Sequence, residues 1–68
     1  MSHRIKAAYY SRQAWIHLGK AQELRNIIRH TDEPFMLMLR RGMLQDEARM
    51  ARTNMHTAVL YRQMEGRL

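Results

Sequence analysis

The chain has 68 residues and no cysteine, and its 12 Lys and Arg against 6 Asp and Glu give a formal net charge of +6. A chain this short forms one domain at most, with a small core that neither disulfides nor thiolate-bound metal can support. The positive charge favours acidic partners: nucleic acid, an anionic membrane surface or an acidic protein face. We therefore expect a single domain over residues 1–68 that is stabilised by association with another chain.

Hydrophobic residues make up 46% of the chain, and 3 glycines and 1 proline interrupt it. This composition predicts a folded, nearly all-helical protein rather than a disordered tail. No apolar run approaches the roughly 20 residues of a membrane span, and the N-terminal residues lack the apolar segment of a signal peptide. We expect a soluble, cytoplasmic protein without a membrane span.

A first helix is predicted over about residues 4–30. Ser2 can cap its N-terminus, and Gly19 weakens it by about 1 kcal/mol relative to alanine. Its clearest stripe steps alternately by four and three residues, which is typical of a helix that packs lengthwise against another helix. The residues of this stripe are Tyr10, Ala14, His17, Ala21, Leu24 and Ile28.

A second helix is predicted over about residues 34–65. Pro34 marks its start, because proline disfavours the helical conformation in the residue before it but fits the first turn of a helix. Asp32 and Glu33 can cap this helix, and Gly66 can end it. Its apolar stripe consists of Leu37, Leu44, Ala48, Ala51, Met55 and Ala58.

The turn between the two helices is so short that the helices must lie antiparallel. In the register that we predict, the facing pairs are Tyr10 with Met55, Ala14 with Ala51, His17 with Ala48, Ala21 with Leu44, Leu24 with Arg41, and Ile28 with Leu37. The fold class that follows is all-α: an antiparallel two-helix hairpin that dimerises into a four-helix bundle.

Dimerisation is expected because the hairpin leaves many apolar residues outside this pairing. Methionines recur at multiples of seven residues on the second helix, and methionine suits surfaces that repack against a partner. Exposed apolar patches larger than a few hundred Å² usually mark an interface. The residues predicted for the dimer or a second interface are Ile5, Tyr9, Trp15, Ile16, Met50, Tyr61 and Met64.

The sequence contains no recognisable catalytic, cofactor-binding or metal-binding pattern. The four histidines lack metal-ligand spacing, and the serines and threonines lack a recognisable base. We therefore expect a small non-enzymatic regulatory protein that binds another protein, such as a transcription regulator or another cellular machine, and modulates or inhibits it. The candidate contact combines apolar anchors with arginine, as interface hot spots do: Phe35, Met36, Leu39, Arg40 and Met43.

The alternative function is that of a basic DNA-binding transcriptional regulator. In this interpretation residues 35–41 and the residues from Met43 onward form a helix-turn-helix around Gly42. The net charge supports it. Against it, Met43 and Leu44 are apolar where a recognition helix carries base-contacting side chains, and Asp46 would face the phosphates.

Two further surfaces carry weaker hypotheses. A basic cluster on the second helix could contact an acidic protein or nucleic acid, or could keep the protein soluble. It consists of Arg40, Arg41, Arg49 and Arg52 with His56. Trp15 and its neighbours on the first helix resemble an interfacial membrane helix, but they fit helix packing equally well.

Overall fold

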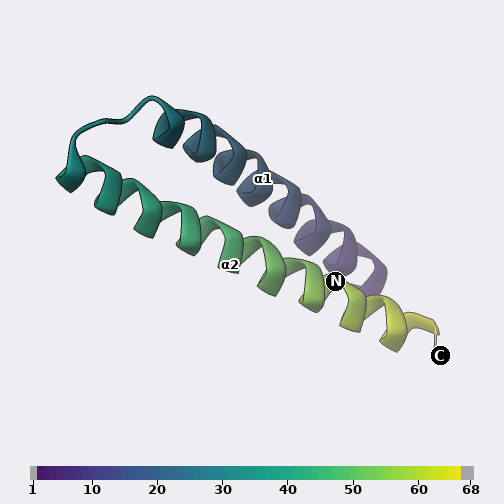
Figure 1. The fold of residues 1–68 in the computed structure, drawn as a ribbon. Coiled ribbons are helices and arrows are strands. Elements are labelled where there is room, and N and C mark those ends of the chain that lie inside the picture. The colour runs from purple at the N-terminus through teal and green to yellow at the C-terminus, as the bar shows by residue number, and fades with distance from the viewer. Residues whose placement is uncertain (1, 67–68) are drawn as a thin grey trace.

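The computed structural model describes residues 2–66, which form two α-helices joined by a short turn (Figure 1). Helix α1 spans His3–Arg29 and helix α2 spans Pro34–Gly66. The helices run antiparallel and side by side, so the molecule has a turn end and, opposite to it, an open end where both termini lie. The predicted all-α hairpin is confirmed, and its helices begin and end within one residue of the expected positions.

Side chains cap the N-termini of both helices, as the sequence predicts. The Ser2 hydroxyl accepts a hydrogen bond from the Ile5 N–H at 3.2 Å. At the start of α2 the Glu33 carboxylate accepts hydrogen bonds from the N–H groups of Phe35, at 3.1 Å, and Met36, at 2.6 Å. The negative charge of Glu33 also stabilises the positive end of the helix dipole. These caps fix where each helix begins.

The turn is held together by Thr31. Its hydroxyl donates a hydrogen bond to the Ile27 carbonyl at 2.6 Å and accepts one from Arg40 Nη1 at 2.6 Å. The backbone N–H groups of His30 and Thr31 donate to the carbonyls of Ile27 and Ile28. The Arg40 side chain therefore ties α2 to the turn.

Helix α2 continues through Gly42 without interruption. A Cβ atom at this position would meet nothing within 4 Å, so no close approach requires a glycine here. A helix tolerates such a glycine at a cost of about 1 kcal/mol relative to alanine. The helix-turn-helix expected in the DNA-binding alternative needs a turn at Gly42, and α2 has a regular helical turn there instead.

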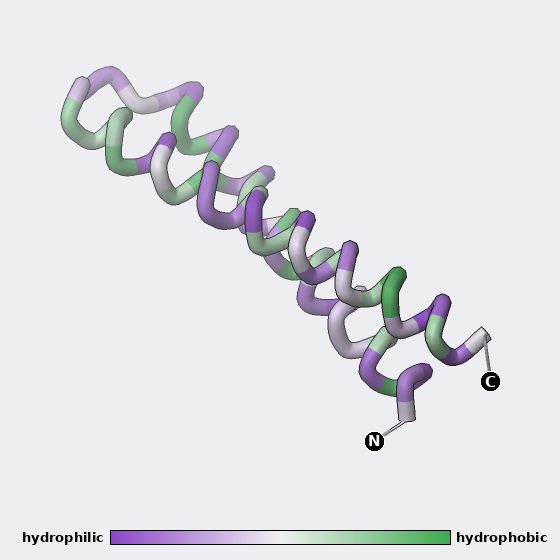
Figure 2. Tube along the Cα trace, turned by 90° about the horizontal axis from the view of Figure 1, so that it is seen from below, coloured by the Kyte–Doolittle hydropathy of each residue, from purple (hydrophilic) through white to green (hydrophobic). Residues whose placement is uncertain are grey.

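The hairpin is long and thin, with extents of 53 × 15 × 13 Å. Its radius of gyration is 15.5 Å, against about 11 Å for a compact domain of this length. Its accessible surface of 5479 Å² exceeds by about a fifth the roughly 4500 Å² expected of a compact protein of 8.2 kDa. Figure 2 shows hydrophobic residues dispersed among hydrophilic ones along both helices. Two helices alone therefore leave much of the apolar surface uncovered.

Candidate functional site

The contact between α1 and α2, which we call the seam, is built mainly from alanine. The buried side chains of the described residues are Ala7, Ala14, Ala21, Leu24 and Ala58. The three alanines of α1 lie seven residues apart, and the facing line on α2 has the same period. That line consists of Leu37, Leu44, Ala51 and Ala58. Because alanine is small, it lets two helices approach closely and leaves no room for large side chains between them.

The stripe predicted on the first helix largely coincides with this seam. Ala14, Ala21 and Leu24 are buried, whereas the other three residues of the stripe, Tyr10, His17 and Ile28, are half-buried. Ala7 was missed, although it lies one heptad before Ala14 and could have been found by extending the seven-residue period toward the N-terminus.

A polar contact joins the two helices near the middle of the seam. His17 Nδ1 lies 2.5 Å from Glu47 Oε2, and the two side chains are 17% and 25% exposed. In the predicted register His17 faces Ala48, and its side chain bonds to the next residue along α2, Glu47. A hydrogen bond between partly buried groups contributes about 1 kcal/mol. Sequence reasoning missed this pair, although a carboxylate next to the expected partner of His17 was a usable signal.

Aromatic side chains close the open end. The Tyr61 ring stacks on both His3 and Tyr10, with centroid separations of 5.6 and 5.8 Å. The ammonium group of Lys6 lies 5.5 Å from the centroid of the same ring, within range of a cation–π interaction. Tyr61 is thus half-buried by its own chain, which leaves part of its ring for the interface predicted from the sequence.

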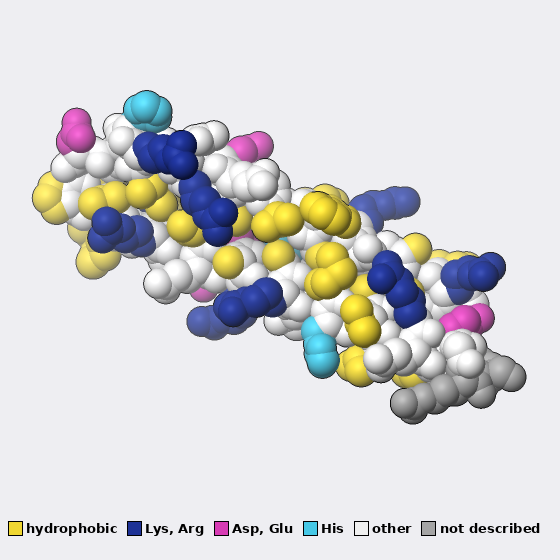
Figure 3. Space-filling model, turned by 45° about the vertical axis from the view of Figure 1, so that its right-hand side comes forward, with side chains coloured by type: hydrophobic (Ala, Val, Ile, Leu, Met, Phe, Trp, Pro, Cys, Tyr) yellow, Lys and Arg dark blue, Asp and Glu magenta, His cyan; other side chains and the backbone are white. Residues whose placement is uncertain are grey.

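One side of the hairpin, which we call the methionine side, is mainly apolar, with Lys6 beside Tyr9 on its α1 part. Its α2 line consists of Met36, Met43, Met50, Thr57 and Met64, and the four methionines are 38% to 55% exposed. Met64 shares a hollow with Tyr61, which also lines a hollow with Tyr9 of α1. Tyr9 and Ile16, one heptad further on, therefore belong to this side. Figure 3 shows one face of the hairpin, on which hydrophobic side chains lie along the whole length with Lys and Arg side chains among them.

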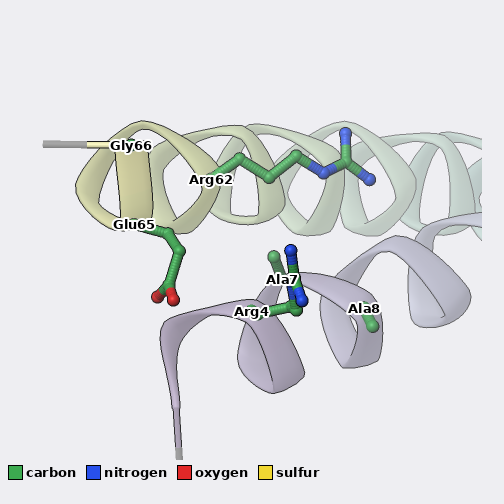
Figure 4. Close-up of a pocket in the computed structure, with 6 residues that line it drawn as sticks. All are labelled: Arg4, Ala7, Ala8, Arg62, Glu65 and Gly66. Carbon is green, nitrogen blue, oxygen red and sulfur yellow. The ribbon is translucent and has the colours of Figure 1, made fainter. Parts of the chain in front are cut away.

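The opposite side, which we call the arginine side, has an arginine at each end of both helices. Arg62 is two residues from Met64, a rotation of about 200°, so the two point to opposite sides of α2. Arg4 and Arg62 line one hollow at the open end (Figure 4). Arg25 lies three heptads after Arg4 on α1. Arg41 lies three heptads before Arg62 on α2 and lines a hollow at the turn end. All four side chains are exposed.

Between these arginine pairs the arginine side is mostly apolar. Leu18 and Met55 lie at the flanking heptad positions in its middle, with Ser11 and Ala48, and all four are half-buried. Trp15 stands one turn from Leu18 and is 64% exposed. The arginine side therefore has a hollow beside arginine at each end and a mostly apolar floor between them, with exposed Arg52 on the α2 rim. We call this side the groove.

Few carboxylates lie near the arginines of this groove. Glu65 lines the open-end hollow, and Figure 4 shows its carboxylate directed toward the N-terminal end of α1. Within residues 2–66 the only salt bridge is His17–Glu47, in the seam. The guanidinium groups of the four arginines thus have no carboxylate partner in the described part of the chain.

The structure brings together the residues predicted as the partner contact, with one exception. Phe35, Met36, Leu39 and Met43 are 59%, 38%, 45% and 55% exposed. Each lies three or four residues from another of the set, so they form one patch on α2 near the turn. Arg40 is half-buried and hydrogen-bonded to the turn. We call these five residues the turn-end contact.

The residues predicted for the dimer or a second interface lie on different sides of the hairpin. Four are exposed on the methionine side: Tyr9, Ile16, Met50 and Met64. Trp15 lies one heptad from Ala8, which lines the hollow of the arginine side. Ile5, which is 56% exposed, faces away from the seam on α1. A single flat interface therefore cannot include both Trp15 and the methionine side.

Other kinds of site are not found in the described residues. No group of three or more His, Asp or Glu side chains there is placed to hold a metal ion. No helix in that part of the chain combines the length and apolar character that a membrane span requires. No protein-family model matches this sequence, and comparison with curated proteins and with solved structures gave no match. The surfaces of the hairpin are therefore the basis for a functional proposal.

Proposed function

We propose that this chain is a small non-enzymatic regulatory protein that binds another protein and modulates or inhibits it. The observation that supports this proposal is the distribution of side-chain sizes. Among residues 2–66 the buried side chains are four alanines and one leucine, whereas fourteen large hydrophobic side chains are at least 38% exposed. Contiguous exposed apolar surface on a small protein usually marks an interaction site.

The proposed regulator is a homodimer. Two hairpins that pack through the open-end half of the methionine side form a four-helix bundle, in which each apolar strip is covered by the other copy. The contact residues are Tyr9, Ile16, Met50 and Met64, with the exposed part of Tyr61. The excess surface of the single hairpin and its small alanine core support association, because a core of this size stabilises a short chain only weakly.

The target protein binds the turn-end contact in this proposal. Phe35, Leu39 and Met43 supply apolar anchors, and methionine side chains adapt their shape to the surface that they meet. Arg40 fixes the turn beside them and presents the rest of its guanidinium group to a carboxylate of the target. Such a protein regulates its target by occluding the surface to which it binds.

The experiment is affinity capture of the tagged protein from a lysate of its own source, with and without nuclease, followed by mass spectrometry. Leu39→Glu places a charge in the turn-end contact. Gln63→Glu introduces the same charge at an exposed position on α2 and serves as the matched control. We expect one defined protein to survive nuclease treatment with the wild type and with Gln63→Glu, and to be lost with Leu39→Glu.

Two results would contradict the proposal. Retention of the same protein by Leu39→Glu would show that the turn-end contact does not bind the target. Loss of all retained material on nuclease treatment, with binding that weakens steeply as salt rises, would support the nucleic-acid alternative. Because α2 is continuous through Gly42, such binding would use the basic surface of the hairpin and not a helix-turn-helix.

A further inference from the structure

We propose that the arginine side is a second binding groove, which takes an acidic amphipathic helix of a partner protein. This groove is separate from the methionine side, and its use depends neither on the dimer nor on the turn-end contact. The proposal rests on the arginine pairs at the two ends of the groove and on the apolar floor between them.

The arginine pairs set the length of the partner helix. Arg4 and Arg25 are three heptads apart on α1, and Arg41 and Arg62 are three heptads apart on α2. At a rise of about 1.5 Å per residue, the two ends of the groove lie about 31 Å apart. A helix that reaches both ends therefore carries its acidic residues three heptads apart, on the face that meets the groove.

The chemistry of the groove sets the rest of the partner's pattern. Guanidinium groups bind carboxylates through two parallel hydrogen bonds, so Glu or Asp is expected opposite each arginine pair. Leu18 and Met55 form the middle of the floor and are half-buried, so the facing residues of the partner are apolar. Trp15 on the rim offers a large, rigid contact surface to the same helix.

A second copy of the chain does not fit this groove. Two hairpins that meet through their arginine sides bring arginine against arginine at both ends, whether they lie parallel or antiparallel. Like charges brought together across an interface cost several kcal/mol. The acidic residues of the chain offer little compensation. Glu65 places one carboxylate beside the two arginines of the open end, while Glu47 is bonded to His17 in the seam and Glu33 caps α2. The occupant is therefore a different protein.

A nucleic-acid occupant fits the groove less well than an acidic helix. A phosphate backbone carries charge along its whole length, and it gains affinity from each phosphate that a basic residue neutralises. The floor between the two arginine pairs offers Leu18, Ala48 and Met55, with Arg52 exposed on the α2 rim beside them. An acidic helix matches both the charged ends and the apolar middle.

The test uses a designed peptide as the probe. It is a synthetic helix of about 28 residues, or four heptads, with paired Glu in its first and last heptads and leucine facing the floor between them. The peptide contains no tryptophan, so binding is followed by the fluorescence of Trp15, the one tryptophan of the chain, and by anisotropy of a labelled peptide. We expect a Kd of about 10 µM or tighter at about 0.15 M salt.

Charge reversal at the open end separates groove binding from general attraction. Arg4→Glu with Arg62→Glu should weaken binding by about tenfold or more, because the two new carboxylates then face the Glu residues at one end of the peptide. A peptide with Lys in place of Glu at one end should restore most of that affinity, which also shows that the variant is folded. Arg12→Glu with Arg49→Glu makes the same change at exposed positions outside the groove and should change the Kd by less than about twofold at this ionic strength.

Three results would overturn the proposal. One is the absence of binding to the peptide by wild-type protein. Another is equal weakening by the two charge-reversed variants, which would mean that only net charge attracts the peptide. The third is tighter binding of duplex DNA than of the peptide, with the same dependence on Arg4 and Arg62, which would assign the groove to nucleic acid.

Discussion

The methionine side and the arginine side flank the same alanine seam, but they differ in what can cover them. On the methionine side the α2 line carries four methionines and no charge, and Lys6 lies at the α1 edge beside Tyr9 and Tyr61. A second hairpin that packs against the α2 line meets mainly apolar side chains. On the arginine side the ends of the groove repel another copy. One hairpin can therefore present two surfaces that do not compete, because self-association on one side leaves the other exposed.

The largest effect is expected from charges on the methionine side. Met50→Glu with Met64→Glu should raise the Kd of the proposed dimer by at least about 100-fold, because carboxylates without partners are costly to bury. Sedimentation equilibrium measures this change, and circular dichroism checks that helicity is kept.

The matched control places the same charges on the arginine side. Met38→Glu with Val59→Glu replaces two residues that are 61% and 38% exposed. Met38 lines the turn-end hollow with Arg41, and Val59 is two residues from Tyr61, a rotation of about 200°, so it points away from the methionine side. These changes should leave the dimer intact. If both double variants dissociate it equally, the two sides do not have the separate roles proposed here.

A smaller effect is expected in the seam that both sides share. Ala14 is 2% exposed, so Ala14→Leu overpacks the contact between the helices and should lower the free energy of unfolding by about 1–3 kcal/mol. Ala8→Leu adds the same atoms at an exposed position and should change stability by less than about 0.5 kcal/mol. Urea denaturation at one fixed protein concentration makes the comparison, because dimerisation couples stability to concentration. Equal effects of both substitutions would mean that the seam is not closely packed.

The smallest effect is expected at Gly42, on the outer surface of α2. Gly42→Ala should raise the free energy of unfolding by about 0.5–1 kcal/mol, because alanine favours the helix and its Cβ meets nothing within 4 Å. Both sides of the hairpin should keep their binding properties. Destabilisation by this substitution, measured in urea, would show that α2 needs a bend here, which would restore the basis of the helix-turn-helix alternative.

The two helices and their antiparallel arrangement could be predicted from the sequence because their signals are local. Pro34 and the capping groups of Ser2 and Glu33 act within one turn of the helix that each begins. The stripe with four-three steps that contains Ala14, Ala21 and Leu24 similarly indicated part of the seam. Each of these signals comes from residues within one helix or its first turn, so it can be recognised without knowing which residues of the other helix it faces.

The finer features depend on how the two helices meet, and the spacing along one helix does not determine this. The hydrogen bond of His17 is one example, because it goes to Glu47, the neighbour of the residue that faces His17 in the expected register. How the two helices meet also decides that Trp15 lies on the arginine side and Ile16 on the methionine side, although the two residues are adjacent in sequence. The division of the predicted interface residues between two sides could therefore not be read from one stripe.

The closeness of the two chain ends makes the hairpin suitable for insertion into another protein. Arg4 and Gly66 line the same hollow at the open end, so a surface loop of a carrier protein could be replaced by residues 2–66 at two neighbouring attachment points. Phe35 and Leu39 would then be displayed at the tip of a rod roughly 50 Å long. Grafted in this way, the turn-end contact could be studied on a carrier whose mass and stability do not depend on self-association.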